Sequence, residues 1–328
     1  MILAGDIGGT KVNLAWFNVE GGQLVRGPEA TYRSRDHDSL CAIIQRFTSD
    51  HSVPVRIGAF GVAGPIRDGR AQLTNLSWIV DAEELQRELK LDRVFLLNDL
   101  QANAYGISTL EPGEVIVLNA GSPARNGNLA IISAGTGLGQ AALLWTGSEY
   151  IAIASEGGHA DFAPRTDLDA ELLAYLRERF VQPSWEHVLS GPGFYHVYQF
   201  LRDSGHGEEP GWLTEEFRRV DPAVAITKAG LAQTCPLCVQ TLDLFVGYYG
   251  AEAANLSLKF LATGGLYLGG GIAPKIAAKL QDGSFLRSFI GQGRMKDLLG
   301  AIPVRVILND KAALIGAARH AATRSGLL

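Results

Sequence analysis

The stretch that decides the fold is the first one, Ile2-Leu3-Ala4-Gly5-Asp6-Ile7-Gly8-Gly9-Thr10-Lys11. A short apolar run ends in an aspartate, two glycines and a threonine, and a second apolar run follows at residues 12–17. Glycine has no Cβ and tolerates positive φ, so this order predicts two strands joined by a tight turn with exposed backbone N–H groups. Those donors, together with the Thr10 hydroxyl and the Lys11 ammonium, suit an anion such as a phosphate.

Asp6 has no evident packing role at the end of the first predicted strand. A carboxylate in this position could hold a hydrated divalent cation beside the phosphate. The alternative is a simple hairpin with an acid that has no function. The turn alone does not decide between these two interpretations, so the decision depends on the rest of the chain.

The composition is that of a soluble globular protein. The chain has 328 residues, of which 47% are hydrophobic and 19% charged, and this length allows two domains with separate cores. The net charge of -5 and the lack of a Lys/Arg cluster argue against a nucleic-acid partner. No apolar run reaches the roughly 18 residues of a membrane span, which argues against a membrane partner.

Two features predict a cytoplasmic location. The first strand is expected to begin at residue 2, with no basic segment before it that would indicate a signal peptide. The three cysteines are few for a chain of this length and fit a reducing compartment. Cys235 and Cys238 form a CxxC pair, but a zinc site needs about four ligands. With Pro236 between them, these cysteines more simply begin a helix.

The order of the predicted elements indicates an α/β fold. Apolar residues recur at helical spacing over residues 40–47, and apolar strands are predicted at 55–62 and 94–97. Strands followed by a helix and another strand are typical of α/β proteins. The last of these strands leads into Asn98 and Asp99, and α/β proteins place ligands at the carboxyl ends of parallel strands.

A domain boundary is predicted at residues 110–113, and beyond it the opening pattern repeats. Residues 129–145 again indicate a strand, a glycine turn and a strand, and a shift of 129 residues places Gly8 on Gly137. Two related α/β halves would each offer a glycine turn to a cleft between them. The remainder is rich in predicted helices: 167–180, 184–189 with a break at Gly191-Pro192-Gly193, 236–261 and 311–322.

Glycine turns follow predicted buried strands at residues 8–9, 135–139 and 269–271, which together suggest a nucleotide held from both sides. The two standard phosphate loops do not fit. The second turn is GxGxG and leads into a strand, whereas the dinucleotide motif is GxGxxG before a helix. Residues 64–71 have the glycine spacing of a P-loop, but they end in Arg-Ala where the P-loop has Lys-Ser/Thr.

Asn98 and Asp99 are the pair that most suggests catalysis. An aspartate at the carboxyl end of a strand can accept the proton of a substrate hydroxyl as its oxygen attacks phosphorus. A carboxylate with a pKa of about 3.9 is a poor base at neutral pH. In phosphoryl transfer, however, positioning the hydroxyl matters more than early deprotonation. The alternative is that Asp99 caps the helix expected from residue 100, and the residues alone leave both roles open.

The segment Glu156-Gly157-Gly158-His159 follows a predicted strand at residues 151–154. Its two glycines allow the carboxylate and the imidazole to point the same way, and such paired groups recognise vicinal hydroxyls. A metal site is the rival interpretation, but it has no further ligand in register. On sequence alone, the residues interpreted as packing or surface groups are His187, His196, His320 and Glu186.

Together these motifs resemble the bacterial ATP-dependent glucokinases of the hexokinase–actin–heat-shock-chaperone ATPase superfamily. They occur in family order across nearly the whole chain, and those at residues 156–164 and 188–193 are the most specific. The segments that carry the resemblance are Asp6-Ile-Gly-Gly-Thr10, Thr74-Asn-Leu-Ser-Trp78, Leu97-Asn-Asp99, Gly135-Thr-Gly-Leu-Gly139, Glu156-Gly-Gly-His-Ala-Asp-Phe-Ala-Pro164, Val188-Leu-Ser-Gly-Pro-Gly193 and Gly269-Gly-Gly-Ile-Ala-Pro274.

The resemblance implies an actin-like two-domain ATPase fold with ribonuclease H-like halves, and glucose bound in the cleft between the domains. It implies ATP-dependent formation of glucose 6-phosphate, the first step of glycolysis, with Mg²⁺ and with Asp99 as base on the 6-hydroxyl. The sugar-binding residues that it implies are Asn75, Asn98, Asp99, Glu156, His159 and Glu186. The nucleotide-binding residues are Asp6 (holding Mg²⁺ through water), Gly8, Gly9, Thr10, Gly135, Thr136, Gly137, Gly270 and Gly271.

The resemblance also implies the domain limits. In this family the terminal helix returns to complete the first domain, so we expect a small domain of residues 1–110 and 309–328 and a large domain of 111–308 with helical insertions. The family further suggests a homodimer.

The opening motif is equally close to the repressor/ORF/kinase sugar-kinase family, whose members usually carry a cysteine-rich zinc motif after a Glu-x-Gly-His segment. Here the residues after His159 are Ala-Asp-Phe-Ala-Pro, which favours the zinc-free glucokinase branch. Two other functions stay open. One is a sugar-responsive regulator or chaperone-like ATPase, although no helix-turn-helix precedes the first strand, and the other is a kinase of a different hexose.

Overall fold

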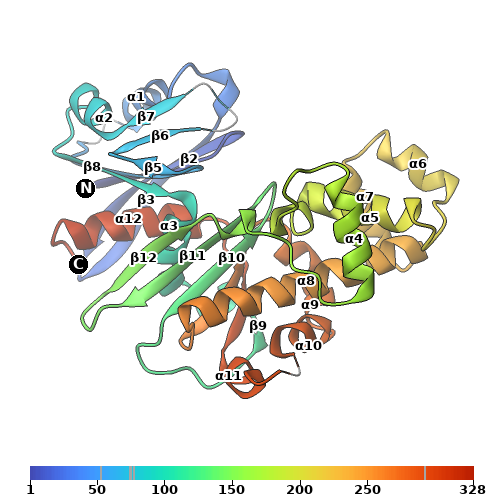
Figure 1. Ribbon diagram of the computed structural model, residues 1–328. Helices are drawn as coiled ribbons and strands as arrows, with labels where there is room; N and C mark the ends of the chain where they lie inside the picture. The colour runs from blue at the N-terminus through green and yellow to red at the C-terminus, as the bar shows by residue number, and fades with distance from the viewer. Residues whose placement is uncertain (52–53, 74–75, 77, 292) are drawn as a thin grey trace. The chain divides into compact units, whose positions relative to one another are not determined.

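The computed structural model describes residues 1–51, 54–73, 76, 78–291 and 293–328 (Figure 1). The described chain divides into two compact units. The first unit contains Met1–Pro112, Ala152–Ala154 and Asn309–Leu328, and the second contains Gly113–Ile151 and Ser155–Leu308. Asn75, which the resemblance places beside the sugar, lies outside the described residues.

The first unit is built on a mixed sheet with the strand order β3-β2-β1-β4-β8. β1 pairs antiparallel with β2 and β2 with β3, whereas β1–β4 and β4–β8 are parallel. The opening stretch therefore forms the predicted hairpin, in which Ile7 lies opposite Val12. The strands are β1 (Ile2–Ile7), β2 (Lys11–Glu20), β3 (Gln23–Arg33), β4 (Ile57–Val62) and β8 (Arg93–Asn98).

Alternate residues of β1 belong to two separate cores, as the period of a strand requires. Ile2 and Ala4 belong to a core with the alanines of α12, whereas Leu3 belongs to a core with Phe47 of α1. Both faces of the sheet are therefore buried. The helices of this unit are η1 (Ser34–Asp36), α1 (Leu40–His51), α2 (Ala82–Glu88), α3 (Asp99–Gly106), η2 (Ile107–Thr109) and α12 (Ala312–Arg324). The short η3 (Pro112–Glu114) begins at the limit between the units.

The C-terminal helix α12 lies against α3 at very close range (Figure 1). A methyl group at Gly316 would overlap the carbonyl oxygen of Ala102, and one at Gly106 would overlap that of Ala312. The two backbones can approach only because both positions lack a Cβ.

A small antiparallel sheet, β5-β6-β7, completes the first unit. The segment with the glycine spacing of a P-loop forms the β5–β6 hairpin of this sheet, so it has no helix of its own to hold a phosphate. Asp81, the last residue of β7, caps α2 by accepting hydrogen bonds from Glu83 N and Glu84 N. The strands are β5 (Ile66–Arg67), β6 (Arg70–Gln72) and β7 (Ile79–Asp81).

The second unit has its own mixed sheet, with the order β12-β11-β10-β13-β14-β9. β10–β11 is antiparallel, β10–β13 and β13–β14 are parallel, and β9 pairs antiparallel with β14. The strands are β9 (Val115–Asn119), β10 (Leu129–Ala134), β11 (Leu138–Trp145), β12 (Tyr150–Ser155), β13 (Gly265–Gly269) and β14 (Val304–Ile307).

The β10–β11 hairpin repeats the topology of the opening hairpin, but the predicted shift of 129 residues is wrong. Gly8 N donates to Lys11 O across the first turn, and Gly135 N donates to Gly137 O across the second. Gly8 therefore corresponds to Gly135, because the second turn is one residue shorter. In each hairpin this glycine directly follows the last paired residue of the first strand, Ile7 or Ala134.

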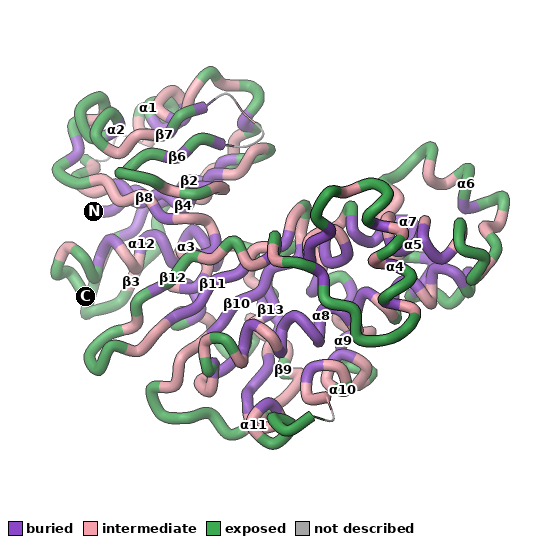
Figure 2. Tube along the Cα trace, in the orientation of Figure 1, coloured by how far each residue is buried: buried purple, intermediate pink, exposed green. Residues whose placement is uncertain are grey.

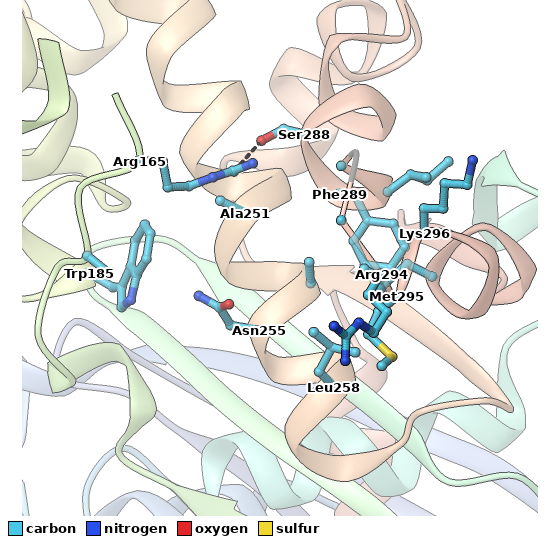
Figure 3. Close-up of a pocket in the computed structure, with 16 residues that line it drawn as sticks. Arg165, Trp185, Ala251, Asn255, Leu258, Ser288, Phe289, Arg294, Met295 and Lys296 are labelled. Carbon is cyan, nitrogen blue, oxygen red and sulfur yellow. Dashed lines mark hydrogen bonds between the residues drawn. The ribbon is translucent and has the colours of Figure 1, made fainter. Parts of the chain in front are cut away.

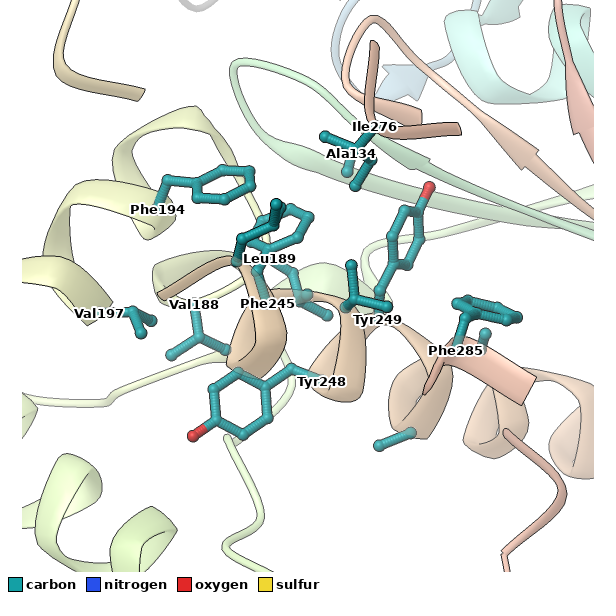
Figure 4. Close-up of a cluster of buried hydrophobic side chains, with 14 of the residues drawn as sticks. Ala134, Val188, Leu189, Phe194, Val197, Phe245, Tyr248, Tyr249, Ile276 and Phe285 are labelled. Carbon is teal, nitrogen blue, oxygen red and sulfur yellow. The ribbon is translucent and has the colours of Figure 1, made fainter. Parts of the chain in front are cut away.

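The long helix α8 (Pro236–Phe260) forms the centre of the core of the second unit (Figure 2). Its predicted apolar face is buried. On this face Phe245 stacks on Phe194 with ring centroids 3.8 Å apart (Figure 4). One turn further along, the Tyr249 hydroxyl donates to Ile132 O of β10 at 3.2 Å, which ties the helix to the sheet.

The predicted break at Gly191-Pro192-Gly193 is wrong, because these residues are the first turn of α5. Ser190 is the N-cap and accepts a hydrogen bond from Gly193 N at 3.0 Å. Proline at the start of a helix removes an N–H that would have no partner in the helix, so it favours a start there.

The remaining helices of the second unit are η4 (Gly157–His159), α4 (Asp167–Arg177), η5 (Trp185–His187), α5 (Gly191–Asp203), α6 (Gly211–Phe217), α7 (Pro222–Leu231), η6 (Ala273–Ile276), α9 (Ala277–Leu280), α10 (Ser284–Ile290) and α11 (Lys296–Ala301). Among the helices formed by the described residues, none is both long and apolar enough to cross a lipid bilayer.

Candidate active site

The glycine turn of the first unit is held in place by Ser34. The Ser34 hydroxyl donates to Gly8 O at 2.8 Å, and Ser34 N donates to Thr10 O at 3.0 Å. Within the described chain, no group accepts a hydrogen bond from the N–H of Gly9 or of Thr10. These two donors are therefore available to an anion, as the sequence predicts. Gly8 does not adopt positive φ, so the need for a left-handed backbone does not explain why this residue is glycine.

Asp6 lies beside this turn, in β1, and is half-buried. Its Oδ2 accepts a hydrogen bond from Asn13 Nδ2 at 3.1 Å, and Asn13 in turn accepts one from the Thr31 hydroxyl. Burial raises the pKa of Asp6, although the Asn13 hydrogen bond and the charge of Lys11 counteract this effect. A partly buried carboxylate that has, among the described residues, Asn13 as its one side-chain donor is a group that a cation would stabilise.

Asn98, rather than Asp99, caps α3. Asn98 Oδ1 accepts from Leu100 N at 2.9 Å, and its Nδ2 donates to Gly64 O at 3.1 Å. Asp99 is the first residue of the helix and is half-buried, and its Oδ1 also accepts from Leu100 N. Asn98 is therefore the main cap of the helix, so capping does not by itself explain the acid at position 99. The Asn98 amide uses one of its two hydrogens on Gly64 O and keeps the other for a ligand.

In the second unit, three segments meet around the turn at Gly135–Gly137. Gly191 N, at the start of α5, donates to Gly135 O at 2.8 Å. Ile272 N donates to Ala134 O at 3.2 Å. Gly270 has φ of +80°, and a Cβ there would overlap the Ala134 carbonyl, so glycine is required at this position. The two glycine segments that the sequence assigned to ATP in this half of the chain are therefore neighbours.

The proposed sugar-binding residues of this unit also converge. His159 Nε2 lies 4.0 Å from Glu156 Oε2, and His159 Nδ1 lies 4.0 Å from Glu186 Oε1. The exposed fractions of the side chains are 64% for Glu156, 62% for His159 and 30% for Glu186, so all three are accessible. Two carboxylates on either side of an imidazole form the array of acceptors and donors that neighbouring hydroxyls need.

The peptide groups of Leu138 join the glycine turn to these sugar-binding candidates. Leu138 N donates to Glu186 Oε2 at 2.9 Å. Its carbonyl oxygen packs against Gly158, where a Cβ would overlap it, and a Cβ at Gly137 would lie 2.6 Å from Glu186 Oε2. The glycines at 137 and 158 thus permit close approach, and they do not adopt positive φ.

Sequence reasoning missed a buried polar pair beneath this loop. Gln140 Nε2 donates to Glu252 Oε1 at 2.8 Å, and Gln140 Oε1 lies against the backbone of Gly157. Burial raises the pKa of Glu252, and the hydrogen bonds from Asn255 and Gln140 partly offset this increase. The signal was present, because Glu252 continues the apolar face of α8 that includes Phe245 and Tyr249.

The other chemically suggestive residues have structural surroundings. Cys235 is the N-cap residue of α8 and Cys238 lies in its first turn, and both are buried free thiols. His320 packs between Phe95 and Tyr105. Among the described residues, no cluster of three or more His, Cys, Asp or Glu side chains is arranged to hold a metal ion.

Comparison with known proteins identifies the family. The sequence model described as Glucokinase matches residues 3–324. The chain belongs to the glucokinase family. A glucokinase of Nostoc punctiforme is 44% identical over 98% of this chain and 99% of its own length. The assignment to the glucokinase branch, predicted from the residues after His159, is confirmed, and the activity is ATP-dependent phosphorylation of glucose.

Solved structures support the same assignment and confirm the predicted fold class. A glucokinase from an Antarctic psychrotroph has 34% identity and a TM-score of 0.85, with 98% of each chain covered. A repressor/ORF/kinase-family glucokinase from Streptomyces griseus, solved with glucose and AMPPNP, shares the fold at 21% identity and a TM-score of 0.64. The glucokinase-family chain therefore has the actin-like two-domain ATPase fold.

Proposed function

We propose that Asp99 is the catalytic base of this glucokinase-family enzyme. The 6-hydroxyl oxygen of glucose attacks the γ-phosphorus of ATP, the bond from that phosphorus to the bridging oxygen breaks, and ADP leaves. The hydroxyl proton passes to the Asp99 carboxylate. Support comes from the half-buried position of Asp99 at the end of β8, where its neighbour Asn98 supplies the cap of α3.

The sugar is held by Glu156, His159 and Glu186, with Asn98 donating its free amide hydrogen. The observation that carries this assignment is the convergence of the three side chains. Glu156 is the N-cap of η4, His159 ends η4 and Glu186 lies in η5. Each carboxylate lies 4.0 Å from a nitrogen of the imidazole. Asn75 completes the proposed set on the family resemblance alone, since it lies outside the described residues.

The phosphates of ATP are bound by backbone N–H groups of the two glycine turns. Gly9 and Thr10 contribute their N–H groups in the first unit, and Thr136 and Gly137 contribute theirs in the second. Such successive donors form concave sites for anions. The full proposed set for the nucleotide is Asp6, Gly8, Gly9, Thr10, Gly135, Thr136, Gly137, Gly270 and Gly271, with the last two against the adenosine.

Asp6 is the residue that would hold Mg²⁺, through water. Its buried carboxylate fits the ion, because a cation would offset the cost of charge that raises its pKa. Mg²⁺ typically binds through one or two carboxylates plus the substrate phosphates, so a full cage of protein ligands is not required. When bound, the ion would neutralise negative charge on the phosphate oxygens.

Replacement of Asp99 tests the proposed base. Asp99→Asn keeps an oxygen that can accept from Leu100 N, so the helix start is preserved while the proton acceptor is lost. General base catalysis contributes about 10²–10⁴-fold, and kcat should fall by that factor. Glucose affinity, measured by calorimetry without ATP, should stay within about threefold of the wild-type value. Near-normal kcat in this variant would refute the role of Asp99.

We also propose that the two compact units are the two domains of the family fold, with the first completed by α12. The three free cysteines suit a reducing cytoplasm, where we place the protein. The homodimer implied by the family remains part of this proposal, and sedimentation velocity tests it directly.

A further inference from the structure

A separate cavity of about 440 Å³ lies in the second unit (Figure 3). Figure 3 draws Asn255 of α8 in the middle of its lining, with Trp185 on one side and Arg294 and Met295 on the other. Cavities of roughly 300–1,000 Å³ are typical of small-molecule sites. Neither the nucleotide-binding candidates nor the sugar-binding candidates line this cavity.

The lining combines cationic and apolar groups. Arg165, Arg294 and Lys296 supply positive charge, and the described residues of the lining include no Asp or Glu. In the described part of the chain, none of these three cations is in an ion pair. Arg165 instead donates to the Ser288 hydroxyl at 2.9 Å, which fixes its guanidinium on one wall (Figure 3).

The apolar part of the lining is large enough to take an organic body as well as an anionic head. It includes Trp185, Leu258, Phe289, Ile290, Met295 and Leu299. A head with several acceptor oxygens suits arginine, whose planar fork matches phosphate. The chemistry of the walls therefore favours a phosphate monoester over a free inorganic anion or an uncharged apolar ligand.

We propose that this cavity is an effector site for a small phosphate monoester, and that its occupancy changes the affinity of the enzyme for glucose. The coupling part of this inference rests on the proposed role of the Glu156–His159 loop in binding the sugar. The binding part does not depend on that role.

Two hydrogen bonds and one packing contact connect the cavity to the proposed sugar-binding loop. Asn255 lines the cavity and donates from Nδ2 to Glu252 Oε2 at 2.9 Å. Glu252 is fully buried, and its other oxygen accepts from Gln140 Nε2 at 2.8 Å. Gln140 Oε1 then lies against Gly157, inside the loop that carries Glu156 and His159.

A second connection runs through the wall of the cavity. Trp185 lines it and directly precedes Glu186, the carboxylate that accepts from Leu138 N. Trp185 N also donates to Ala160 O, next to His159. A ligand that moves the indole would therefore act on Glu186 and on Ala160, the residue that follows His159.

The expected sign of the coupling is negative. A phosphate that draws the Asn255 amide toward the cavity turns it away from Glu252 and weakens the hydrogen bond that the amide donates there. If Glu252 loses one of its two donors, its contact with Gln140 and the support of Gly157 change. Glucose should therefore bind more weakly when the cavity is occupied, and by linkage the ligand should bind more weakly in the presence of glucose by the same factor.

The binding test uses phenyl phosphate as the probe, with inorganic phosphate and phenol as the two half-probes. Titration calorimetry should show saturable binding of phenyl phosphate to the wild-type protein, and weaker binding of each half-probe. Arg294→Ser should lower the affinity about tenfold or more, because a charge-assisted hydrogen bond is lost. The matched control is Arg219→Ser, which removes an exposed arginine of the same unit outside the cavity and should leave binding unchanged.

The coupling test measures the glucose dissociation constant with and without saturating phenyl phosphate. Wild-type protein should bind glucose about fivefold more weakly when phenyl phosphate is bound. It should bind phenyl phosphate more weakly by the same factor when glucose is bound. In Glu252→Gln, an amide replaces one of the carboxylate acceptors, so probe binding should persist while the coupling factor falls toward one. Asn255→Ala, at a half-buried position, removes the donor instead and should also abolish the coupling.

The outcomes separate the two parts of the inference. Equal phenyl phosphate affinity in wild type and Arg294→Ser, or no binding to the wild type, overturns the site. Unchanged coupling in both Glu252→Gln and Asn255→Ala overturns the hydrogen-bonded connection. Normal glucose affinity in Glu156→Gln would instead refute the proposed sugar loop, while the calorimetric test of the cavity would still stand.

Discussion

The substitution Gly137→Ala tests the connection between the glycine turn and Glu186, the carboxylate that we propose binds the sugar. A methyl group at this position would lie 2.6 Å from Glu186 Oε2, whereas an ordinary contact begins at 3.4 Å. The same oxygen accepts from Leu138 N at 2.9 Å. The carboxylate must therefore move away from its backbone donor, and the donor loses a charged partner.

The size of the effect follows from that lost hydrogen bond. A hydrogen bond to a charged group contributes about 1.5–3 kcal/mol, and each 1.4 kcal/mol or so corresponds to a factor of ten in binding. Because water can satisfy part of the exposed carboxylate, we take the lower end of this range. The KM for glucose should rise about tenfold at saturating ATP, measured with a coupled assay of ADP release.

Gly135→Ala is the matched control. It lies in the same turn, does not adopt positive φ, and a methyl group there meets no other group within 4 Å. Its glucose KM should change by no more than about twofold, as for a substitution without a structural mechanism. Equal increases in both variants, or no increase in Gly137→Ala, would refute the argument that Glu186 is oriented by Leu138.

Two further predictions concern stability. Gly316→Ala should lower the free energy of unfolding, measured in urea, by about 1–3 kcal/mol, because its methyl group overlaps the Ala102 carbonyl. The control is Gly300→Ala, which has open space around it and should be neutral or stabilising in the same measurement. Asp6→Asn should raise the thermal midpoint at pH 7 while abolishing activity. The folded state disfavours the charged form of this acid, so its cost appears as pH rises above the ordinary pKa of 3.8 and is absent below it. A lower midpoint for Asp6→Asn at pH 7 would contradict this sign.

Much of the fold followed from local patterns. The opening hairpin, the helix at residues 40–47 and the long helix from Pro236 were all predicted and are present. Each depends on a period of apolar residues or on a local turn signal, and these act over short distances along the chain. The start of α5 departs from the prediction although its signal is local, because glycine and proline after an N-cap serine can begin a helix as well as interrupt one.

The arrangement of the site could be predicted only in part. The glycine turns and the pair at Asn98 and Asp99 were identified as candidates from their place after strands. Which of these two residues caps the helix could not be predicted, since either residue type can do so and only the backbone geometry selects Asn98. Glu186 looked like a surface acid because the group that gives it a role, the Leu138 N–H, lies 48 positions away in the chain.

The contacts at Leu138 explain why sequence reasoning reached the residue types and stopped short of the geometry. The Leu138 side chain is buried, while its N–H orients Glu186 and its carbonyl fixes the approach of Gly158. Both contacts are made by backbone groups: every residue type has the carbonyl, and all except proline have the N–H. The residue type at 138 therefore reflects packing, whereas the glycines at 137 and 158 reflect the close approach that these backbone contacts require. Close approach, rather than positive φ, is the constraint at Gly137 and Gly158, so a search for glycines with crowded Cβ positions would recover this part of the site where a search for strained turns would not.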